Sequence, residues 1–97
     1  MSTMSTMTDV EKAAALLGLL GHPKRLEALL VLAEGALSAG ELAGRLGLEQ
    51  SAMSHQLRLL REANLVVSER VGRRVVYAVA DHHVTHIVRD AVAHVGE

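Results

Sequence analysis

The chain has 97 residues, a length that allows one small domain. Apolar residues make up 49% of it, yet Tyr77 is its only Phe, Tyr or Trp, so the core must be built from Leu, Val, Ala and Met, and a sheet that stacks nucleic-acid bases on aromatic rings is excluded. The formal net charge of −1 excludes a general basic coat, so any binding to DNA depends on a local basic patch.

The absence of cysteine and of long apolar segments limits the kinds of protein that the sequence can encode. The sequence has no cysteine, which excludes disulfide bonds, thiolate metal sites and thiol redox switches. It shows no signal-peptide pattern, and no apolar run approaches the ~18 residues that span a bilayer. We therefore expect a soluble, cytoplasmic protein with no membrane partner. Because so short a domain buries a modest share of its surface, we also expect it to pair with a second copy.

The first residues have neither a helical nor a strand period. The opening MSTMSTMT is a short repeat of small polar residues and Met, so we expect a disordered tail over 1–8 and a single domain over 9–97. A helical pattern starts at Asp9 and stops at Gly21. Its apolar residues fall near one face, namely Val10, Ala14, Leu17 and Leu20.

Three more helices are predicted between residues 23 and 64. PKRLEALLVLAEG starts on Pro23, which suits the first turn of a helix, and stops at Gly35. SAGELAGRLG begins with Ser38 and has Glu41 three residues later, the spacing of a capping box. The link GLEQ then leads into SAMSHQLRLLREAN. Two short helices joined by a glycine-containing turn predict a helix-turn-helix.

The hydrophobic period then changes from 3.6 to 2. LVVSER and RRVVYAV, with Gly72 between them, predict a β-hairpin that would form a wing. DHHVTHIVRDAVAHVGE returns to a helical pattern with its apolar residues on one side, namely Val84, Ile87, Val88, Ala91 and Val95. The sequence thus predicts a mainly α fold with a β-hairpin, a winged helix-turn-helix in the order α-α-α-α-β-β-α, and a homodimer through its first and last helices.

Basic residues gather in the helix-turn-helix and the hairpin. Between Gln50 and Arg74 there are five arginines and two glutamates, a local surplus of three positive charges. A helix-turn-helix places the N-terminal residues of its second helix at base edges in the major groove. The residues that we expect to contact DNA are Gln50, Ser51, Ser54, His55, Gln56, Arg58, Arg61, Arg70, Arg73 and Arg74. A solvated face with scattered arginines is the alternative, but the helix pair followed by an Arg-tipped hairpin favours duplex DNA.

LGLEQSAMSHQLRLLREANLV, followed by RVGRRVVYAV and DHHV, resembles the ArsR/SmtB family of winged-helix bacterial repressors. The resemblance covers about residues 9–97, and SHQLRLLR is its most specific part. It implies a homodimer that binds an imperfect inverted repeat in double-stranded operator DNA and leaves it when an inducer, usually a metal ion, is bound. Repression is implied by this resemblance alone.

The resemblance also implies metal ligands in the last helix. Family sensors of zinc, cobalt or nickel carry an Asp-x-His pair, a His eleven residues later and a Glu or His three residues after that. The residues at these spacings are Asp81, His83, His94 and Glu97. The cysteine-based site that other members carry at the start of the helix-turn-helix has no counterpart here, so thiolate sites for arsenite, lead, cadmium or Cu(I) are excluded.

The spacing of the two histidines has a physical consequence. His83 and His94 lie about three helical turns apart, roughly 16 Å along the axis, so one helix cannot place both on one ion. We expect antiparallel last helices of a dimer to form two sites, each joining Asp81 and His83 of one copy to His94 and Glu97 of the other. Two imidazoles and two carboxylates suit tetrahedral Zn(II) best, with Co(II) as an alternative. Ni(II) prefers more ligands, which His82 or His86 could add.

The family also suggests a route from metal to DNA. The nitrogen of His94 that does not bind metal would donate a hydrogen bond to backbone near Leu60 to Asn64, at the end of the recognition helix.

Each of these residues taken singly also has a structural explanation. Asp81 is a good N-cap, His94 is favoured near a helix C-terminus and can pair with Asp90, and Glu97 can belong to a frayed end. The alternative function is a winged-helix regulator with a non-metal inducer and the histidines as a pH-sensitive face. We do not expect an enzyme, because the four-ligand site uses both carboxylates in coordination and leaves no general base.

Overall fold

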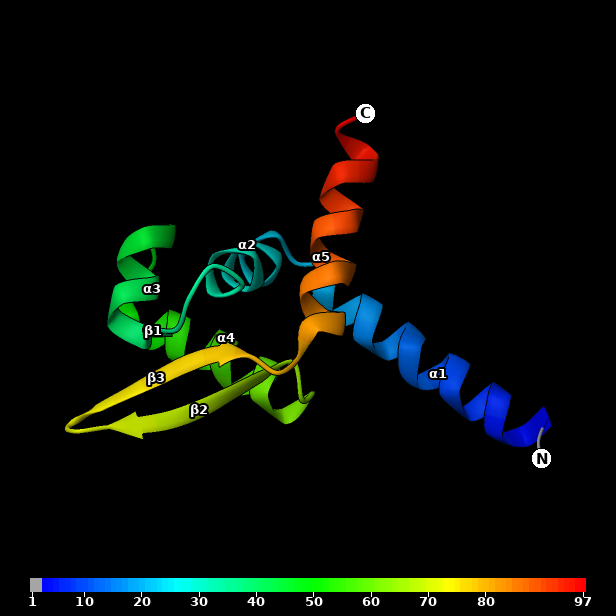
Figure 1. Cartoon of the computed structure of the whole chain (residues 1–97), viewed down its shortest axis with the longest axis horizontal. Coiled ribbons are helices and arrows are strands. Elements are labelled where there is room, and N and C mark those ends of the chain that lie inside the picture. The colour runs from blue at the N-terminus through cyan, green and yellow to red at the C-terminus, as the bar shows by residue number, and fades with distance from the viewer. Residues whose placement is uncertain (1–2) are drawn as a thin grey trace.

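The computed structural model describes residues 3–97, with side chains from Thr8 onward. Within this part the chain forms five helices and three strands (Figure 1). In chain order they are α1 (Thr3–Leu20), α2 (Pro23–Leu32), β1 (Leu37–Ser38), α3 (Ala39–Leu46), α4 (Gln50–Glu62), β2 (Val66–Val71), β3 (Arg74–Val79) and α5 (His82–Val95). The predicted winged helix-turn-helix is confirmed, with one additional short strand.

That additional strand is β1. Leu37 pairs with Tyr77 and Ser38 with Val76, so β1 extends the hairpin to a three-stranded antiparallel sheet in the order β1-β3-β2. Two residues are too few to show an alternating pattern in the sequence. The strand forms because the hairpin presents the open edge of β3 to the segment that leads into α3.

Helix α1 begins earlier than the sequence pattern indicated. The expected tail covered residues 1–8 with a helix from Asp9, whereas α1 starts at Thr3; Met1 and Ser2 lie outside the described residues. No Gly or Pro separates Thr3 from Asp9, so nothing in the backbone stops the helix from continuing toward the N-terminus.

The hairpin has the predicted two strands and turn. Its register runs from Val66 opposite Val79 to Val71 opposite Arg74, which leaves Gly72 and Arg73 as the loop. Gly72 has a φ of +64°, a conformation that two-residue hairpin loops require and that glycine adopts without strain. The hairpin extends away from the helices as a long wing (Figure 1).

The core is wholly apolar within the described residues. Helix α4 contributes the predicted stripe, Met53, Leu57 and Leu60, all fully buried. Other buried residues come from α1 (Leu20), α2 (Ala28, Leu29, Leu32), α3 (Leu42, Ala43, Leu46), the start of the hairpin (Leu65, Val66) and α5 (Val84, Val88). Burial of one face of α4 leaves its opposite face exposed, which is the face available for a ligand.

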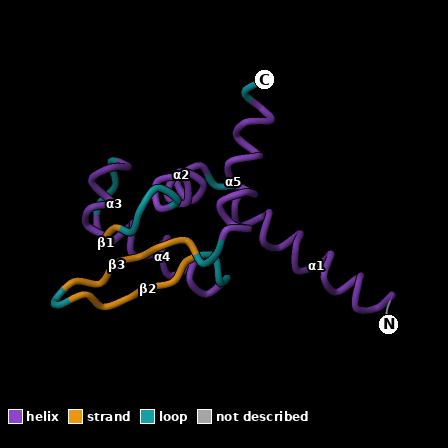
Figure 2. Tube along the Cα trace, in the orientation of Figure 1, coloured by secondary structure: helices purple, strands orange, loops and turns teal. Residues whose placement is uncertain are grey.

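Helices α1 and α5 frame one end of the molecule. Figures 1 and 2 show α1 projecting from the body on one side and the C-terminal half of α5 projecting upward, both away from the wing. The main contacts of α1 are with α2, and it leaves Leu17 58% exposed. Among the described helices, none combines the length and the apolar character needed to cross a bilayer.

Candidate functional site

Two helix caps set the geometry of the helix-turn-helix formed by α3 and α4. The Ser38 hydroxyl accepts the N–H of Glu41 at 3.2 Å, and Glu41 Oε1 accepts the N–H of Ser38 at 2.9 Å, which confirms the predicted capping box. Helix α3 ends at Leu46. Its C-cap Gly47 has a φ of +70°, in the left-handed region, and α4 starts at Gln50. This short link brings the N-terminus of α4 to the surface.

The far end of α4 is closed by Asn64. Its φ is +62°, its N–H donates to the carbonyl of Arg61 at 3.0 Å, and the N–H of Leu65 donates to the carbonyl of Leu60 at 2.9 Å. These two bonds form a Schellman motif, in which a left-handed residue reverses the chain after the last helical turn. The motif directs the chain from α4 straight into β2 and so sets the wing beside α4.

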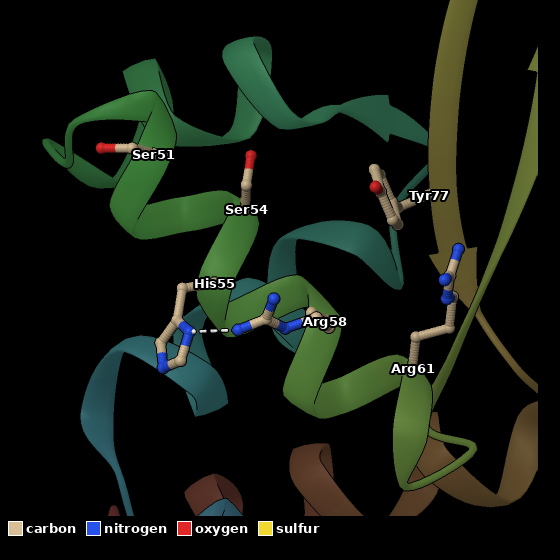
Figure 3. A pocket seen from close by; sticks show the side chains of 6 residues that line it. All are labelled: Ser51, Ser54, His55, Arg58, Arg61 and Tyr77. Carbon is tan, nitrogen blue, oxygen red and sulfur yellow. Dashed lines mark hydrogen bonds between the residues drawn. The ribbon is translucent and has the colours of Figure 1, made fainter.

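A hollow of about 520 Å³ lies between α4 and the wing. It is lined by Ser51, Ser54, His55, Arg58, Arg61 and Tyr77, which Figure 3 shows along one side of α4 with Tyr77 facing them from β3. Ser51, Ser54, His55 and Arg58 are exposed. The Arg58 guanidinium lies 3.2 Å from Nδ1 of His55. Hydroxyl, imidazole and guanidinium groups on one exposed helical face are the groups that read base edges and phosphates.

Tyr77 is the lining residue that the sequence reasoning missed. Its alternation with Val75 and Val79 along β3 contained the signal, because residues two apart on a strand share one face of the sheet.

The wing arginines differ in their surroundings. Arg61 of α4 donates to the Ser68 hydroxyl at 3.2 Å, which ties the recognition helix to β2. Arg74 donates to Glu41 of α3 and forms an ion pair with it. Arg70 and Arg73 are exposed near the wing tip, and their side chains make no hydrogen bond or ion pair within the described part of the chain. The tip therefore offers two free guanidinium groups to a phosphate backbone.

The ion pair with Arg74 is one of several contacts that change the pKa of Glu41. The backbone N–H of Ser38, then its hydroxyl, and the charge of Arg74 lower the pKa of the Glu41 carboxyl from its usual value. Each of these contacts favours the ionised form. Glu41 therefore joins the cap of α3 to the first residue of β3.

The two glutamines of α4 differ in their surroundings, and only Gln56 lies away from the exposed row. Gln50 lies against α3, since a Cβ added to Gly40 would be 3.2 Å from Gln50 Oε1. Gln56 is half-buried, and its Oε1 accepts a hydrogen bond from Arg25 of α2 at 2.9 Å. At about 100° per residue Gln56 points ~160° away from Ser54 around α4. It therefore faces the protein interior instead of the surface where we expected it to contact DNA.

The N-terminal end of α5 brings together two of the expected metal ligands. Asp81 is the N-cap, with Oδ1 accepting the N–H of His83 at 2.9 Å and that of Val84 at 3.3 Å. Nδ1 of His83 lies 3.5 Å from the same oxygen. The His82 ring lies 4.2 Å from that of His83 and 5.7 Å from that of His86, centroid to centroid, so three exposed imidazoles cluster here.

The other two expected ligands lie at the opposite end of this helix. His94 is in the last turn of α5, and Glu97 follows the C-cap Gly96, so the helix does not fix Glu97 relative to His94. Both are exposed, and no ion pair joins His94 to Asp90 in the described chain. Within residues 3–97 of one protomer, no three His, Asp or Glu side chains are grouped as a metal ion requires.

The start of α5, and not its end, is connected to α4. The N–H of Ala80 donates to the carbonyl of Leu65 at 3.0 Å, one residue before Asp81 and one residue after Asn64. The C-terminal end of α5 points away from α4 (Figure 1). The expected bond from His94 to backbone at Leu60 to Asn64 is therefore not formed within this protomer.

Known proteins resemble the chain along most of its length. Residues 22–68 match the model of the family described as bacterial regulatory protein, arsR family. The transcriptional regulator NmtR of Mycobacterium tuberculosis is 45% identical over 83 residues, which cover 86% of this chain and 69% of the relative. The transcriptional repressor SmtB of the same organism is 43% identical over 88 residues, 91% of this chain and 65% of the relative.

A solved structure agrees with the fold. The homodimeric winged helix-turn-helix DNA-binding domain of Mb0332 from Mycobacterium bovis aligns with a TM-score of 0.87 at 24% identity, over 100% of this chain and 89% of that one. At this identity the likeness concerns the fold. The chain spans about two thirds of the length of the two curated relatives, 69% and 65%.

Proposed function

The chain belongs to the ArsR family of bacterial DNA-binding transcriptional regulators, a family of regulators and not of enzymes, and we propose that it is a repressor controlled by metal. In this proposal a metal-free homodimer binds an imperfect inverted repeat in operator DNA. Zn(II), or alternatively Co(II) or Ni(II), bound between the α5 helices of the two copies releases it.

The observation that carries the DNA-binding part is the exposed row on α4. Ser51, Ser54 and His55 lie in its first half, where a recognition helix meets base edges, and Arg58 follows one turn later. Arg70 and Arg73 extend the basic surface along the wing. These positions favour base reading by α4 and phosphate contact by the wing.

The apolar surface between α1 and α5 supports the homodimer. Leu17, Ile87 and Val92 are between 37% and 58% exposed, and a largely apolar pocket of about 170 Å³ lies between α1, α2 and α5. The pocket residues are Leu17, Leu20, Gly21, Leu26, Ile87, Val88 and Ala91. We assign a second copy as its occupant, because α1 projects from its own protomer and, although Leu20 is buried there, Leu17 stays exposed beside the pocket and would be covered only by another copy.

The placement of the ligands supports a site shared between copies. Asp81 and His83 are within reach of one ion, but His94 lies roughly 16 Å further along the helix. Antiparallel α5 helices would bring the first pair of one copy to His94 and Glu97 of its partner. The donor set of two nitrogens and two oxygens fits Zn(II), and Asp81 Oδ2 makes no hydrogen bond or ion pair within the described chain. Bound metal would supply a cross-link between the two helices.

Nickel would need a wider ligand set. His82 and His86 lie close to His83, so either imidazole could complete a site with more than four ligands. Zn(II) remains the ion that the four-residue set fits best.

The bond between Ala80 and Leu65 supports a route from metal to DNA. Asp81 follows Ala80 directly, so a change in the position of α5 acts on the C-terminal end of α4 through this backbone bond. The route uses the start of α5, and it replaces the bond from His94 that the resemblance suggested.

The test is a titration of the full chain on DNA. A duplex selected by the protein from a random-sequence library is the probe, and its affinity is measured with EDTA and with added Zn(II). We expect zinc to weaken binding by about 5- to 150-fold, the usual range of allosteric coupling. Equal affinities would reject metal control and leave the regulator with a non-metal inducer.

Matched variants separate coordination from helix capping. Asp81→Asn retains an oxygen that caps α5 but loses the carboxylate, whereas Asp81→Ala loses both. We expect both variants to lose the zinc response, and only the alanine variant to lose about 1 kcal/mol of metal-free stability.

A mixed dimer tests the shared site directly. His83→Ala and His94→Ala homodimers each have two damaged sites, but a heterodimer of the two variants has one intact site and one site without histidine. We expect the heterodimer to bind half the zinc of the wild type at wild-type affinity. If the heterodimer binds as poorly as its parents, the ligands do not come from two copies.

A further inference from the structure

The first turn of α2 carries two cationic side chains that reach three other helices. Lys24 Nζ donates to the carbonyl of Leu46, the last residue of α3, at 3.1 Å. Arg25 Nε donates to the carbonyl of Leu19, in the last turn of α1, at 2.8 Å, and its Nη1 donates to Gln56 Oε1 of α4 at 2.9 Å. The two side chains thus bond α2 to both helices of the helix-turn-helix and to α1.

The chemistry of these acceptors favours cations. The last carbonyls of a helix have no partner within the helix and carry its negative partial charge. Leu19 and Leu46 supply such carbonyls, so each bond is assisted by charge. Arg25 is half-buried, which reduces competition from water.

Arg25 bonds two other helices at once, α1 and α4, whereas Lys24 bonds only α3. Its planar guanidinium presents Nε and Nη1 in a fixed relation, so the position of α1 at Leu19 and the position of α4 at Gln56 are set against each other. Apart from Gln56, the side chains that α4 turns toward the interior are apolar. Apolar contacts are non-directional. The Arg25–Gln56 bond is directional, and with the bond from Arg61 to Ser68 on the wing side it restrains the rotation of α4 about its axis; of the two, only the Arg25 bond refers α4 to α2 and α1.

We infer that Arg25 is a positioning residue for DNA recognition. It holds the recognition helix in a set orientation relative to α1, and in the dimer of the proposed function, on which this inference rests, it keeps the two α4 helices at one spacing. Arg25 itself does not touch DNA. Its loss therefore reduces selectivity for a sequence and not the general attraction to duplex DNA.

Two substitutions remove the bond without changing charge. Arg25→Lys keeps the cation but lacks the fork, and Gln56→Ala removes the acceptor. The probes are the library-selected duplex and an unrelated duplex of the same length, both with EDTA present. We expect each variant to bind the selected duplex about tenfold more weakly and the unrelated duplex as the wild type does. The double variant should lose no more than either single variant.

Arg45→Lys is the matched control. Arg45 is exposed on α3 and its side chain makes no hydrogen bond or ion pair within the described chain, so this variant should bind both duplexes normally. Unchanged binding of the selected duplex by Arg25→Lys and Gln56→Ala, or an equal loss on both duplexes, overturns the inference.

A measurement without DNA separates this inference from the proposed function. The chain has no cysteine, so Ala52→Cys on the exposed side of α4 gives one spin label per copy. We expect a narrow distance distribution between the two labels in the wild-type background, and a broader or shifted one with Arg25→Lys or Gln56→Ala. If the wild type selects no duplex and shows no coupling between labels, the proposed function fails and this inference falls with it. If the wild type does both and the variants match it, the inference alone fails.

Discussion

Arg74 donates a hydrogen bond to Oε1 of Glu41, the same oxygen that accepts the backbone N–H of Ser38. One carboxylate thus caps α3 and holds the first residue of β3. The angle of the wing is therefore linked to the helix that precedes the recognition helix, through a contact between residues 33 positions apart.

The ionisation of Glu41 gives a pH-dependent prediction. Because its pKa is lowered in the folded chain, its contribution to stability is present above the pKa of the unfolded chain and is lost as pH falls through the lowered value. We expect Glu41→Gln to be less stable than the wild type in urea unfolding at pH 7. The difference should shrink as pH falls below about 4, and a difference that stays constant would contradict this account.

Arg73 and Arg74 should contribute differently to DNA binding. The Arg73 side chain makes no hydrogen bond or ion pair within the described chain, whereas that of Arg74 is paired with Glu41. We expect Arg73→Ala to reduce the slope of log affinity against log salt by about 1 on an unrelated duplex. Arg74→Ala should change that slope less. Equal changes would mean that the ion pair opens when DNA binds.

Leu17 should matter for assembly and not for folding. It is 58% exposed on α1, and burying a leucine contributes about 1.5–3 kcal/mol. We expect Leu17→Gln to weaken dimerisation by at least about tenfold in analytical ultracentrifugation. Val67→Gln is the control, since Val67 is 50% exposed on the wing and should leave the dimer intact. A dimer that resists Leu17→Gln would place the interface elsewhere.

Asn64 tests the turn between α4 and the wing. Its φ of +62° is tolerated by Asn and Gly but disfavoured for other residues. We expect Asn64→Gly to match the wild type in urea unfolding and Asn64→Ala to lose about 1 kcal/mol. A neutral alanine variant would show that the left-handed conformation is not needed for stability.

Much of this fold could be predicted because its signals are local. The capping box of Ser38 and Glu41 depends on residues three apart, and the Gly72 turn on one backbone angle. The buried stripe of α4 follows from helical period alone, and so does the exposure of Ser54 and His55 on its other side. Asp81 as N-cap was likewise a prediction from residue type and place.

Tertiary structure decided the contacts between distant segments. The sequence could not tell that Gln56 faces Arg25, because a polar residue beside a polar row has the same local pattern whether it meets DNA or another helix. It could not reveal β1, which exists only because β3 offers an edge, nor the bond of Ala80 to Leu65 that joins α5 to α4. Periodicity determines which face of an element is buried, but only the packed chain determines which polar groups meet across those faces.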